Sequence, residues 1–528
     1  MKSPLKTGCL ALVCLFGPAT FWIIRRQEMT YLNWFLALAV IVWALLFGAW
    51  YLVFGRAKTS RRFLNVFATL GGIVLIGFIL SKTLKYEGSA SGSSYPRFSW
   101  VWNAEKNDSG TTAELVQTEL TGEDLRLLKA QGDSPEFLGP NRDGTFTQLT
   151  FNPDWNTEPP ELLWRRPVGK AWSGFAVKGR MAVTQEQAGD AERVLCLDLF
   201  TGDAIWHHDN PETRLLLVKE ENQGAAMGGD GPRSTPVIHR NHVYALGATG
   251  ILNCLDLTGG DEKWTRNVIT EFKGEVQKWG SANAPLVIES ESILVVPGSD
   301  EPGATLVAFD LETGETRWTY QGNGASYSSP RLLTVAGVEM IISVNRHDVT
   351  GNLPESGEVL WTYPWPGSYP KVGQAVAAGE NRLLFTASYG AGSPLIEVTP
   401  EQDGSWEVRE IWKSTRLKTK FSSAFVVDGF AYGIDEGRLA SIDLETGDKA
   451  WKNQKVGFGQ QLLFGDTLLI QTERGPVITG PVGPDGFTEL SRLEALDSMT
   501  WNVPTVAGRI LLVRNDQEAA CYLLPALK

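Results

Sequence analysis

Four stretches of the chain repeat the pattern Asp-x-x-Thr-Gly-x-x-x-Trp, or a close variant of it, with apolar residues on both sides. Asp and Thr side chains bond nearby backbone N–H groups and Gly adopts a positive φ, so the Asp-x-x-Thr-Gly part predicts a hairpin turn. The Trp adds a large apolar area to the strand after the turn. The copies are 196–206, 254–264, 308–318 and 440–451, and degenerate copies end at Trp361 and Trp412.

A second predicted strand pair precedes each of these hairpins, as in 234–246 and 422–432. Two hairpins form a four-stranded sheet of roughly 40–50 residues, which is the period of a propeller blade. The high counts of Gly, 55, and Trp, 19, agree with a turn-rich all-β protein. The repeat therefore predicts a β-propeller of four-stranded, W-shaped blades.

Counting the strands predicts how the ring closes. Eight inner strand pairs are followed by only seven outer strands, and the chain ends one strand short after its last inner pair. Residues 161–168 read as an outer strand with no inner pair before it, so we expect them to pair with 519–524 and close an eight-bladed ring. Closure removes exposed sheet edges. The alternative is seven blades with irregular ends.

Charge separates the N-terminal part from the rest of the chain. Residues 1–88 carry ten Lys or Arg and two Glu, a net +8, which leaves −20 for the remainder of a chain whose total is −12. An acidic chain of this kind is not expected to bind nucleic acid. The basic part also contains three runs without charged residues, 7–24, 31–54 and 63–81. Because a bilayer core needs roughly 20 apolar residues in a helix, these runs predict three transmembrane helices.

The Lys/Arg bias predicts the orientation of these helices. The dense basic loop 56–62 favours the cytoplasm, so the rest of the chain is expected on the periplasmic, extracytoplasmic side of the inner membrane. We expect a multi-pass membrane anchor over 1–81, a linker over 82–135 that includes the Ser/Gly stretch 89–94, and a propeller over 136–528.

The signature Asp-Leu-x-Thr-Gly-x-x-x-Trp resembles the pyrroloquinoline-quinone-like (PQQ-like, quinoprotein alcohol dehydrogenase-like) propeller repeat, over about 161–525. The wider pattern is similar to that of membrane-anchored bacterial proteins built on this propeller. The stretches that carry this likeness are 137–144, 231–236, 361–367, 500–504, 513–516 and 520–522. This superfamily includes quinone-dependent dehydrogenases and also the scaffold lipoprotein of the outer-membrane β-barrel assembly machinery, which binds no cofactor, so the fold alone does not decide the function.

The residues that lead into the inner strands are expected to line the central funnel, on the face opposite the Asp-x-x-Thr-Gly turns. Five of the eight are aromatic and one is Arg. Such a ring can stack a flat ligand, with Arg233 pairing a carboxylate, or it can simply plug the blade junctions. These positions are Trp172, Arg233, Ala282, Tyr327, Val372, Phe421, Phe458 and Trp501.

Loops on the same face supply acidic side chains. Glu186, Asp348 or Asp435 are candidates for a general base or a calcium ligand, with solvated loop charge as the alternative interpretation. The five His residues show no metal-ligand spacing, so we expect no metal site. The candidate ligand-binding residues are Trp172, Glu186, Arg233, Tyr327, Asp348, Phe421 and Trp501.

These features favour a non-catalytic, membrane-anchored propeller that binds a protein, a peptide or another envelope ligand, with the lipid bilayer as its partner through the N-terminal helices and with no cofactor. The alternative is a PQQ-dependent, membrane-bound dehydrogenase that uses calcium and oxidises an alcohol or a sugar. Membrane-bound quinoprotein glucose dehydrogenases also carry N-terminal helices, but the chain lacks the adjacent Cys pair typical of quinone enzymes and a matching Glu/Asn/Asp calcium set. A ligand sensor ranks last, because the sequence contains no cytoplasmic output domain.

Overall fold

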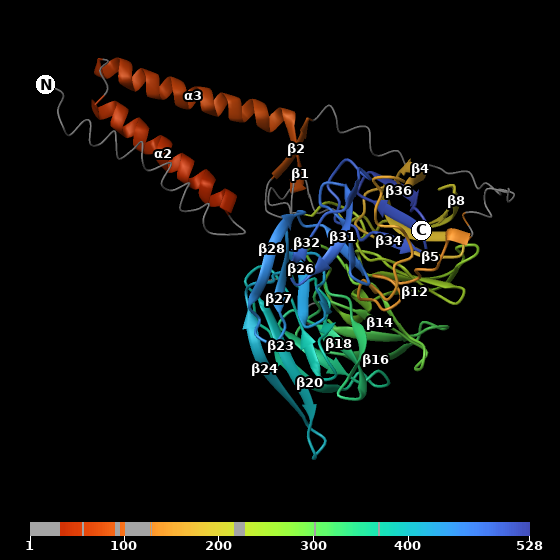
Figure 1. Cartoon of the computed structure of the whole chain (residues 1–528). Coiled ribbons are helices and arrows are strands. Elements are labelled where there is room, and N and C mark those ends of the chain that lie inside the picture. Colours follow the sequence, from red (N-terminus) through yellow and green to blue (C-terminus); the bar gives the residue numbers. More distant parts are fainter. Residues whose placement is uncertain are drawn as a thin grey trace. The chain divides into compact units, whose positions relative to one another are not determined.

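The computed structural model describes residues 32–54, 58–89, 96–100, 127, 129–215, 228–299, 303–367 and 370–527. The chain divides into two compact units, Met1–Lys106 and Asn107–Lys528. Figure 1 shows the elements of both. The first unit contains helices α2 (Leu32–Phe54) and α3 (Thr59–Thr83) and an antiparallel pair of strands, β1 (Leu84–Ser89) and β2 (Pro96–Trp100).

The three predicted membrane spans fall on different parts of this unit. The run 7–24 lies outside the described residues, whereas 31–54 and 63–81 fall on α2 and α3. Over the residues that the structure describes, no helix reaches the length and hydropathy expected of a membrane span.

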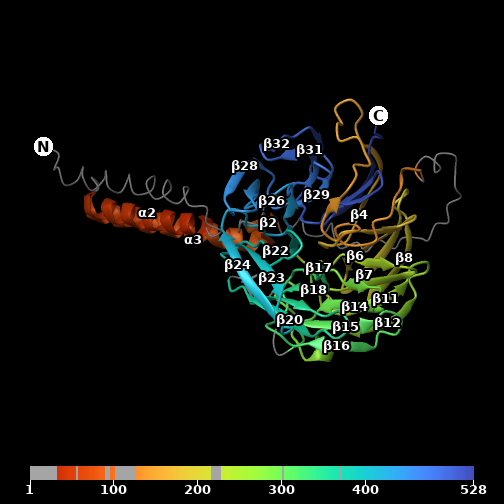
Figure 2. The same ribbon diagram turned by 60° about the horizontal axis from the view of Figure 1, so that its bottom comes forward.

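The second unit is built from eight antiparallel sheets, each with four main strands, which we number as blades 1–8. Colour order in Figures 1 and 2 shows that the blades follow one another along the sequence. Blades 1–4 are β5 (Ala176–Lys178), β6 (Met181–Ala188), β7 (Ala191–Asp198) and β8 (Ala204–Asn210); β9 (Val237–His239), β10 (His242–Leu246), β11 (Ile251–Asp256) and β12 (Glu262–Asn267); β13 (Leu286–Ile288), β14 (Ile293–Pro297), β15 (Leu306–Asp310) and β16 (Thr316–Tyr320); and β17 (Arg331–Val335), β18 (Val338–Val344), β19 (Asp348–Asn352) and β20 (Val359–Pro364).

The remaining blades continue this arrangement, and a short 3₁₀ helix, η2 (Thr270–Phe272), lies between blades 2 and 3. Blade 7 gains two short strands, β3 (Thr145–Phe146) and β32 (Gly486–Phe487). Blades 5–8 are β21 (Val376–Ala377), β22 (Arg382–Leu384), β23 (Ser393–Pro400) and β24 (Trp406–Ser414); β25 (Phe425–Val427), β26 (Phe430–Asp435), β27 (Arg438–Asp443) and β28 (Lys449–Lys455); β29 (Gln460–Phe464), β30 (Thr467–Gln471), β31 (Val477–Gly483) and β33 (Ser491–Leu493); and β34 (Thr505–Ala507), β35 (Ile510–Arg514), β36 (Glu518–Leu523) and β4 (Glu161–Pro167).

The ring closes as the strand count predicts. In blade 8, the early strand β4 pairs antiparallel with β36 at the end of the chain, and Trp164 lies opposite Cys521. Figure 1 shows the orange β4 beside the blue β36. This pairing confirms the eight-bladed fold and excludes seven blades with irregular ends.

The hydrophobic core of this unit is divided among the interfaces between blades. Each of the eight buried clusters in the described chain combines side chains from two neighbouring sheets, and one of them joins blade 8 to blade 1 through Trp164, Leu512 and Val177. Because a sheet that is apolar on both faces needs a partner on each side, closing the ring buries what would otherwise be two exposed faces.

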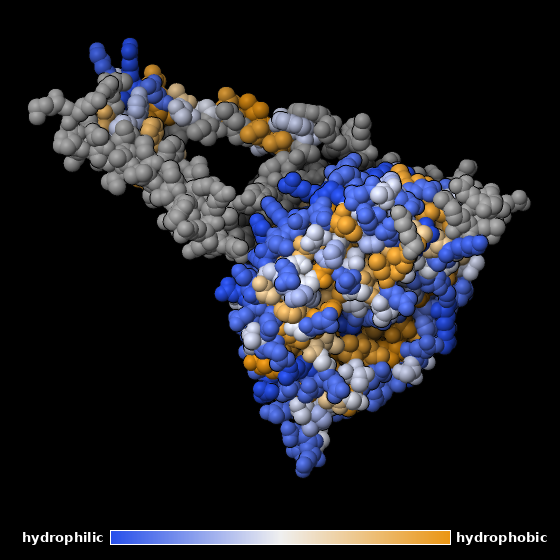
Figure 3. All heavy atoms as spheres, viewed as in Figure 1, coloured by the Kyte–Doolittle hydropathy of each residue, from blue (hydrophilic) through white to orange (hydrophobic). Residues whose placement is uncertain are grey.

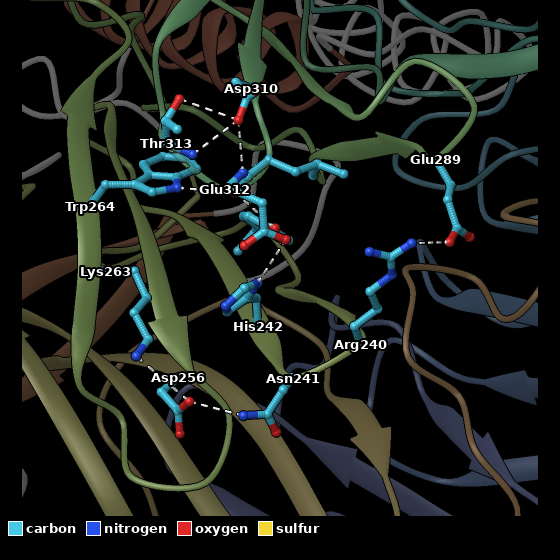
Figure 4. A network of polar contacts seen from close by, with 12 residues as sticks. Arg240, Asn241, His242, Asp256, Lys263, Trp264, Glu289, Asp310, Glu312 and Thr313 are labelled. Atoms are coloured by element: carbon cyan, nitrogen blue, oxygen red, sulfur yellow. Dashed lines mark hydrogen bonds and ion pairs between the residues drawn. The ribbon is translucent and has the colours of Figure 1, made fainter.

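The repeated turn also fastens each blade to the next. In blade 3 the Asp310 carboxylate accepts the N–H groups of Glu312 and Thr313, each at 3.0 Å, and the Trp264 indole of blade 2 donates to the Leu311 carbonyl at 3.1 Å (Figure 4). Gly314 then packs on the Trp264 ring, and a Cβ at this Gly would lie 2.6 Å from a ring carbon. The repeat therefore forms a turn and also packs against the Trp of the preceding blade.

This joint predicts a stability effect for Gly314→Ala. Both Gly314 (φ 69°) and Gly429 (φ 78°) need a positive φ, but a Cβ at Gly429 meets nothing within 4 Å. Backbone strain of about 1 kcal/mol is common to the two Ala variants, whereas overlap with Trp264 adds about 1–3 kcal/mol at Gly314 only. Denaturant unfolding should therefore show Gly314→Ala to be less stable than Gly429→Ala. Equal losses of unfolding free energy in the two variants would mean that the contact between Gly314 and the Trp264 ring contributes nothing to stability.

Alternation of antiparallel strands defines the two faces of the ring. Turns between the third and fourth strands lie at one end of the sheets, which we call the turn face. The connections between the second and third strands, and those that lead into the inner strands, lie at the other end, which we call the loop face. The turn face carries the Asp-x-x-Thr-Gly turns, such as 310–314.

The segment 131–146 follows the inner rim near the turn face. Gly179, in the turn after β5, donates to the Asp133 carboxylate at 2.9 Å, and Gln131 bridges to Gly508 in the matching turn of blade 8. Further along, the Arg142 side chain donates to the Pro285 carbonyl at 2.8 Å, and β3 pairs with β29. Together with bonds to Val177, Ile238 and Arg331 and packing on Phe425, the segment contacts the inner strands of seven blades. It occupies the turn-face end of the central channel.

Candidate functional site

Four of the predicted funnel aromatics form one continuous row at the loop face. Trp172 of blade 1 lies 4.9 Å from Trp501 of blade 8, which lies 5.0 Å from Phe421, and Phe421 lies 6.1 Å from Phe458 (ring centroids). Phe421 leads into blade 6, and blade 7 separates it from the blade of Trp501. Since side chains of non-adjacent blades touch, the rings meet across the mouth of the channel.

A buried cation lies beside this row. The Lys420 ammonium is 4.0 Å from the centroid of Phe458, 5.0 Å from that of Tyr389 and 3.7 Å from a carboxylate oxygen of Glu436. Burial lowers the pKa of Lys420, and the Glu436 charge opposes this shift. The sequence interpretation missed Lys420, although it directly precedes the predicted Phe421. Its place in the basic loop 413–420, immediately before a predicted funnel aromatic, is the signal that could have found it.

The Trp501 indole has a hydrogen-bond partner, whereas the Trp172 indole has none in the part of the chain that the structure describes. Trp501 donates through Nε1 to a Glu473 carboxylate oxygen at 3.0 Å. Trp172 is 8% exposed, and its Nε1 has no hydrogen-bond acceptor among the described residues. Gly229 packs directly on the Trp172 ring, where a Cβ would lie at 2.8 Å. Trp172 therefore places a buried donor without a described acceptor beside the packed rings.

Arg233 and Tyr327 lie away from the aromatic row. The Arg233 guanidinium donates to the carbonyls of Gly231 at 2.7 Å and Gly228 at 3.1 Å, so it braces its own loop. Burial lowers the pKa of Arg233 to about 10. The Tyr327 hydroxyl accepts the Trp279 N–H at 3.3 Å, and the two rings lie 5.6 Å apart. The structure does not bring these two residues into the row with Trp172, Phe421 and Trp501.

The predicted acidic residues are held by the protein's own donors. Glu186 accepts the Gly169 N–H at 2.8 Å, and Asp348 accepts the side-chain amides of Asn323 and Asn345, the latter at 2.8 Å. Asp435 behaves in the same way, since it accepts the Lys418 N–H at 3.0 Å and the Lys452 ammonium at 2.8 Å. These carboxylates have structural partners, which does not fit a free base poised over a substrate.

Amide side chains join the inner strands of neighbouring blades around the channel. Asn283 donates to the Ser328 carbonyl at 2.6 Å, and Asn502 donates to the Ser173 carbonyl at 2.8 Å. Gln185 makes an equivalent bond to Ser234 at 2.7 Å. Because buried carbonyls need donors, these amides fix the rim of the mouth and make it a rigid surface.

Glu192 is a buried carboxyl near this rim, and it predicts a pH effect. It accepts the Ala248 N–H at 3.0 Å, and burial raises its pKa to about 7. A carboxyl with a raised folded-state pKa stabilises the fold below its unfolded pKa, and that contribution is lost as the pH rises through about 7. Glu192→Gln, which cannot ionise, should therefore gain about 2–3 kcal/mol relative to the native chain between pH 5 and pH 8. Urea unfolding at both pH values measures this difference, and an unchanged difference would contradict a buried neutral carboxyl.

In the described residues, no group of three or more His, Cys, Asp or Glu side chains is placed to hold a metal ion. Cys196, Cys254 and Cys521 are separate, buried free thiols. The residues therefore do not fit the adjacent Cys pair and the acidic calcium ligands that the quinone enzymes use.

Comparisons with known proteins identify relatives of two kinds. The family model described as "Outer membrane protein assembly factor BamB" matches residues 190–453. Curated proteins of that name are similar: the one from Shewanella oneidensis is 22% identical over 283 residues, covering 50% of this chain and 69% of the relative, and the one from Burkholderia pseudomallei is 23% identical over 342 residues, covering 57% and 87%.

Solved structures show the same fold at low identity. The quinohemoprotein alcohol dehydrogenase from Comamonas testosteroni matches with a TM-score of 0.53 and 12% identity, over 78% of this chain and 83% of that one. A europium-containing methanol dehydrogenase matches with a TM-score of 0.51 and 12% identity, over 74% and 91%. These likenesses confirm the PQQ-like propeller and extend to the fold alone.

Proposed function

The chain belongs to the family of the outer membrane protein assembly factor BamB, and from this premise we propose that its propeller is a non-catalytic module that binds a protein or peptide partner of the cell envelope. The observation that carries the proposal is that the candidate acids of the loop face are engaged: Glu186, Asp348 and Asp435 each bind donors of the protein itself. Because these acids are already hydrogen-bonded within the protein, the loop face fits a rigid binding surface better than a catalytic site.

The two ends of the channel support the loop face as the binding surface. Segment 131–146 occupies the turn-face end, where Arg142 is buried against the Ala284 and Pro285 carbonyls. The loop face instead carries the aromatic row, of which Phe421 and Trp501 are partly exposed, together with its surrounding loops. Aromatic side chains and a rigid rim are typical of surfaces that bind protein partners.

We propose in addition that residues 1–81 attach the chain to the inner membrane, with the propeller on the extracytoplasmic side. Exposed large apolar side chains on α2 and α3 support this, and Figure 3 shows orange spheres along the helices. Large exposed apolar side chains that gather on one element, rather than being scattered singly, indicate contact with a membrane or a partner. They are Leu45, Leu46, Phe47, Val53, Phe63, Leu64, Phe67, Leu75, Phe78, Ile79 and Leu80.

Fractionation tests the attachment. The full chain should stay in the membrane pellet after alkaline carbonate extraction, and externally added protease should reach the propeller in spheroplasts but not in intact cells. Release of the full chain by carbonate would contradict the anchor. Protection of the propeller in spheroplasts would contradict its side.

The binding function is tested against the dehydrogenase alternative on the full chain in detergent. With added PQQ and calcium, we expect no quinone absorbance retained after gel filtration and no dye reduction by alcohols or sugars. A tagged full chain treated with a cleavable cross-linker in cells should give a discrete adduct with an envelope protein. Quinone-dependent dye reduction would overturn the proposal in favour of the dehydrogenase.

A further inference from the structure

Five basic side chains gather at the loop-face ends of blades 5 and 6. Lys413 lies near the end of β24, Arg416 and Lys418 follow in the connection to β25, Arg438 begins β27 and Lys455 ends β28. The strands place these ends together, because Arg438 and Lys455 are register partners and the Lys418 backbone N–H is bound by Asp435 beside them. We call these five residues the blade 5–6 patch.

The patch is not neutralised within the described part of the chain. Lys413, Arg416, Arg438 and Lys455 are exposed, and none of the four has an acidic side chain within ion-pair distance among the described residues. Lys418 is the exception, at 3.7 Å from Asp435. Several exposed arginines elsewhere on the ring have acidic partners, as in the pairs Arg240–Glu289, Arg409–Glu397 and Arg492–Glu489.

The local acids instead pair with two less exposed lysines, Lys452 and Lys420. Asp435 holds the Lys452 ammonium at 2.8 Å, and Glu436 holds Lys420 at 3.7 Å. Arg438 and Lys455 face each other across the β27–β28 ladder, and like charges in directly opposed positions destabilise a sheet. The fold therefore keeps a local positive excess in a part of the chain whose net charge, outside residues 1–88, is −20.

We propose that the blade 5–6 patch binds an acidic segment, rich in Asp and Glu, of the envelope protein partner; this inference rests on the proposed function. Arg416 and Arg438 can each pair a carboxylate through two N–H groups, and the lysines add unpaired positive charge. Along the chain, Lys418 is followed within three residues by Lys420 and Phe421, and Phe421 belongs to the aromatic row. An acidic segment bound to the patch would thus lie close to the aromatic row, on which its apolar side chains can pack.

A fluorescein-labelled peptide of ten glutamates is the probe, and its anisotropy with the full chain in detergent is the readout. We expect the variant Lys413→Glu/Arg416→Glu/Arg438→Glu/Lys455→Glu to bind at least tenfold more weakly than the native chain. Raising the salt from 50 to 300 mM should weaken native binding several-fold, because exposed charges are screened. Native and variant chains should unfold at similar denaturant concentrations.

Lys455 and Lys449 provide a matched pair on one strand. Both begin or end β28 and both are exposed, but Lys449 lies at the turn-face end. Lys455→Glu should weaken peptide binding two- to fivefold, whereas Lys449→Glu should leave it within experimental error. Equal effects of the two substitutions, or native binding that the fourfold variant retains, would overturn the proposal.

A second probe separates a protein partner from a lipid surface. Dihexanoyl phosphatidylglycerol, a soluble anionic lipid, should displace the peptide only at concentrations far above the peptide's own Kd. Displacement at lower concentrations than unlabelled peptide would assign the patch to a membrane surface and contradict the proposal. If the fourfold variant still forms the cross-linked adduct in cells, the inference about the patch is wrong while the proposed function stands. If the native chain forms no adduct, the proposed function itself is wrong.

Discussion

Replacing Arg514 with Ala should lower the free energy of unfolding by about 3–5 kcal/mol, because the substitution removes the hydrogen-bond hub between the last blade and the first. The Arg514 side chain is 1% exposed and donates to the Thr184 hydroxyl at 2.8 Å, to the Gln185 carbonyl at 2.7 Å and to the Gly169 carbonyl at 2.9 Å. Ala would remove the donor that these three acceptors share, although the Thr184 hydroxyl would still donate to the Gly174 carbonyl. Burial also lowers the pKa of Arg514 to about 10.

Urea unfolding of the full chain, followed by Trp fluorescence, measures this loss. The free energy of unfolding of Arg514→Lys should lie between those of the native chain and Arg514→Ala. An ammonium carries the charge but lacks the planar set of N–H donors of the guanidinium. Arg492→Ala is the control, since Arg492 is 43% exposed and pairs with Glu489 within blade 7, and it should cost less than about 1 kcal/mol. If Arg514→Ala lowers the free energy of unfolding no more than the control does, the Arg514 contacts between blades 8 and 1 do not hold the ring closed.

The second large effect is expected for Arg142→Ala, which should lower the free energy of unfolding by about 2–4 kcal/mol. Arg142 is 6% exposed, donates to the carbonyls of Pro285 and Ala284, and pairs with Glu136 at 3.0 Å. Without these bonds, segment 131–146 loses its attachment to blade 3. We therefore expect chymotrypsin, which can cleave after Phe137 and Leu138, to cut this segment faster in the variant, before the rest of the propeller is digested.

Arg180→Ala is the matched control for Arg142→Ala. Arg180 also pairs with an acid, Asp198, at 2.8 Å, but its side chain is 23% exposed and it serves a single turn of blade 1. It should cost less than about 1 kcal/mol and leave proteolysis of 131–146 unchanged. Unaltered proteolysis of the segment in Arg142→Ala would contradict its role in occupying the channel.

The sequence predicted the parts of the fold that depend on local chemistry and on counting. The Asp-x-x-Thr-Gly turn follows from what Asp, Thr and Gly do within five residues, and Asp310 accepts the two N–H groups that this interpretation requires. The pairing of 161–168 with the end of the chain followed from one missing strand, and it is confirmed by β4 and β36. Neither inference needed knowledge of contacts between side chains.

The candidate site depended on contacts that no local pattern contains. The aromatic row was expected from the positions of Trp172, Phe421 and Trp501, but the packing of Phe421 on Trp501 across an intervening blade depends on the width of the channel. Arg233 was expected to face a ligand, whereas the carbonyls of its own loop bind it. The role of segment 131–146 was missed because its partners lie on seven different blades, far away in the sequence.

Site-specific photo-cross-linking in cells tests most directly whether the loop face is the binding surface. Benzoylphenylalanine is introduced into the full chain at two exposed loop-face positions, Lys278 and Thr415, and at two exposed turn-face positions, Glu312 and Glu445. We predict a discrete adduct with an envelope protein from at least one loop-face position and none from the turn face. Adducts confined to Glu312 or Glu445 would contradict the account, because the partner would then bind the face that carries the turns.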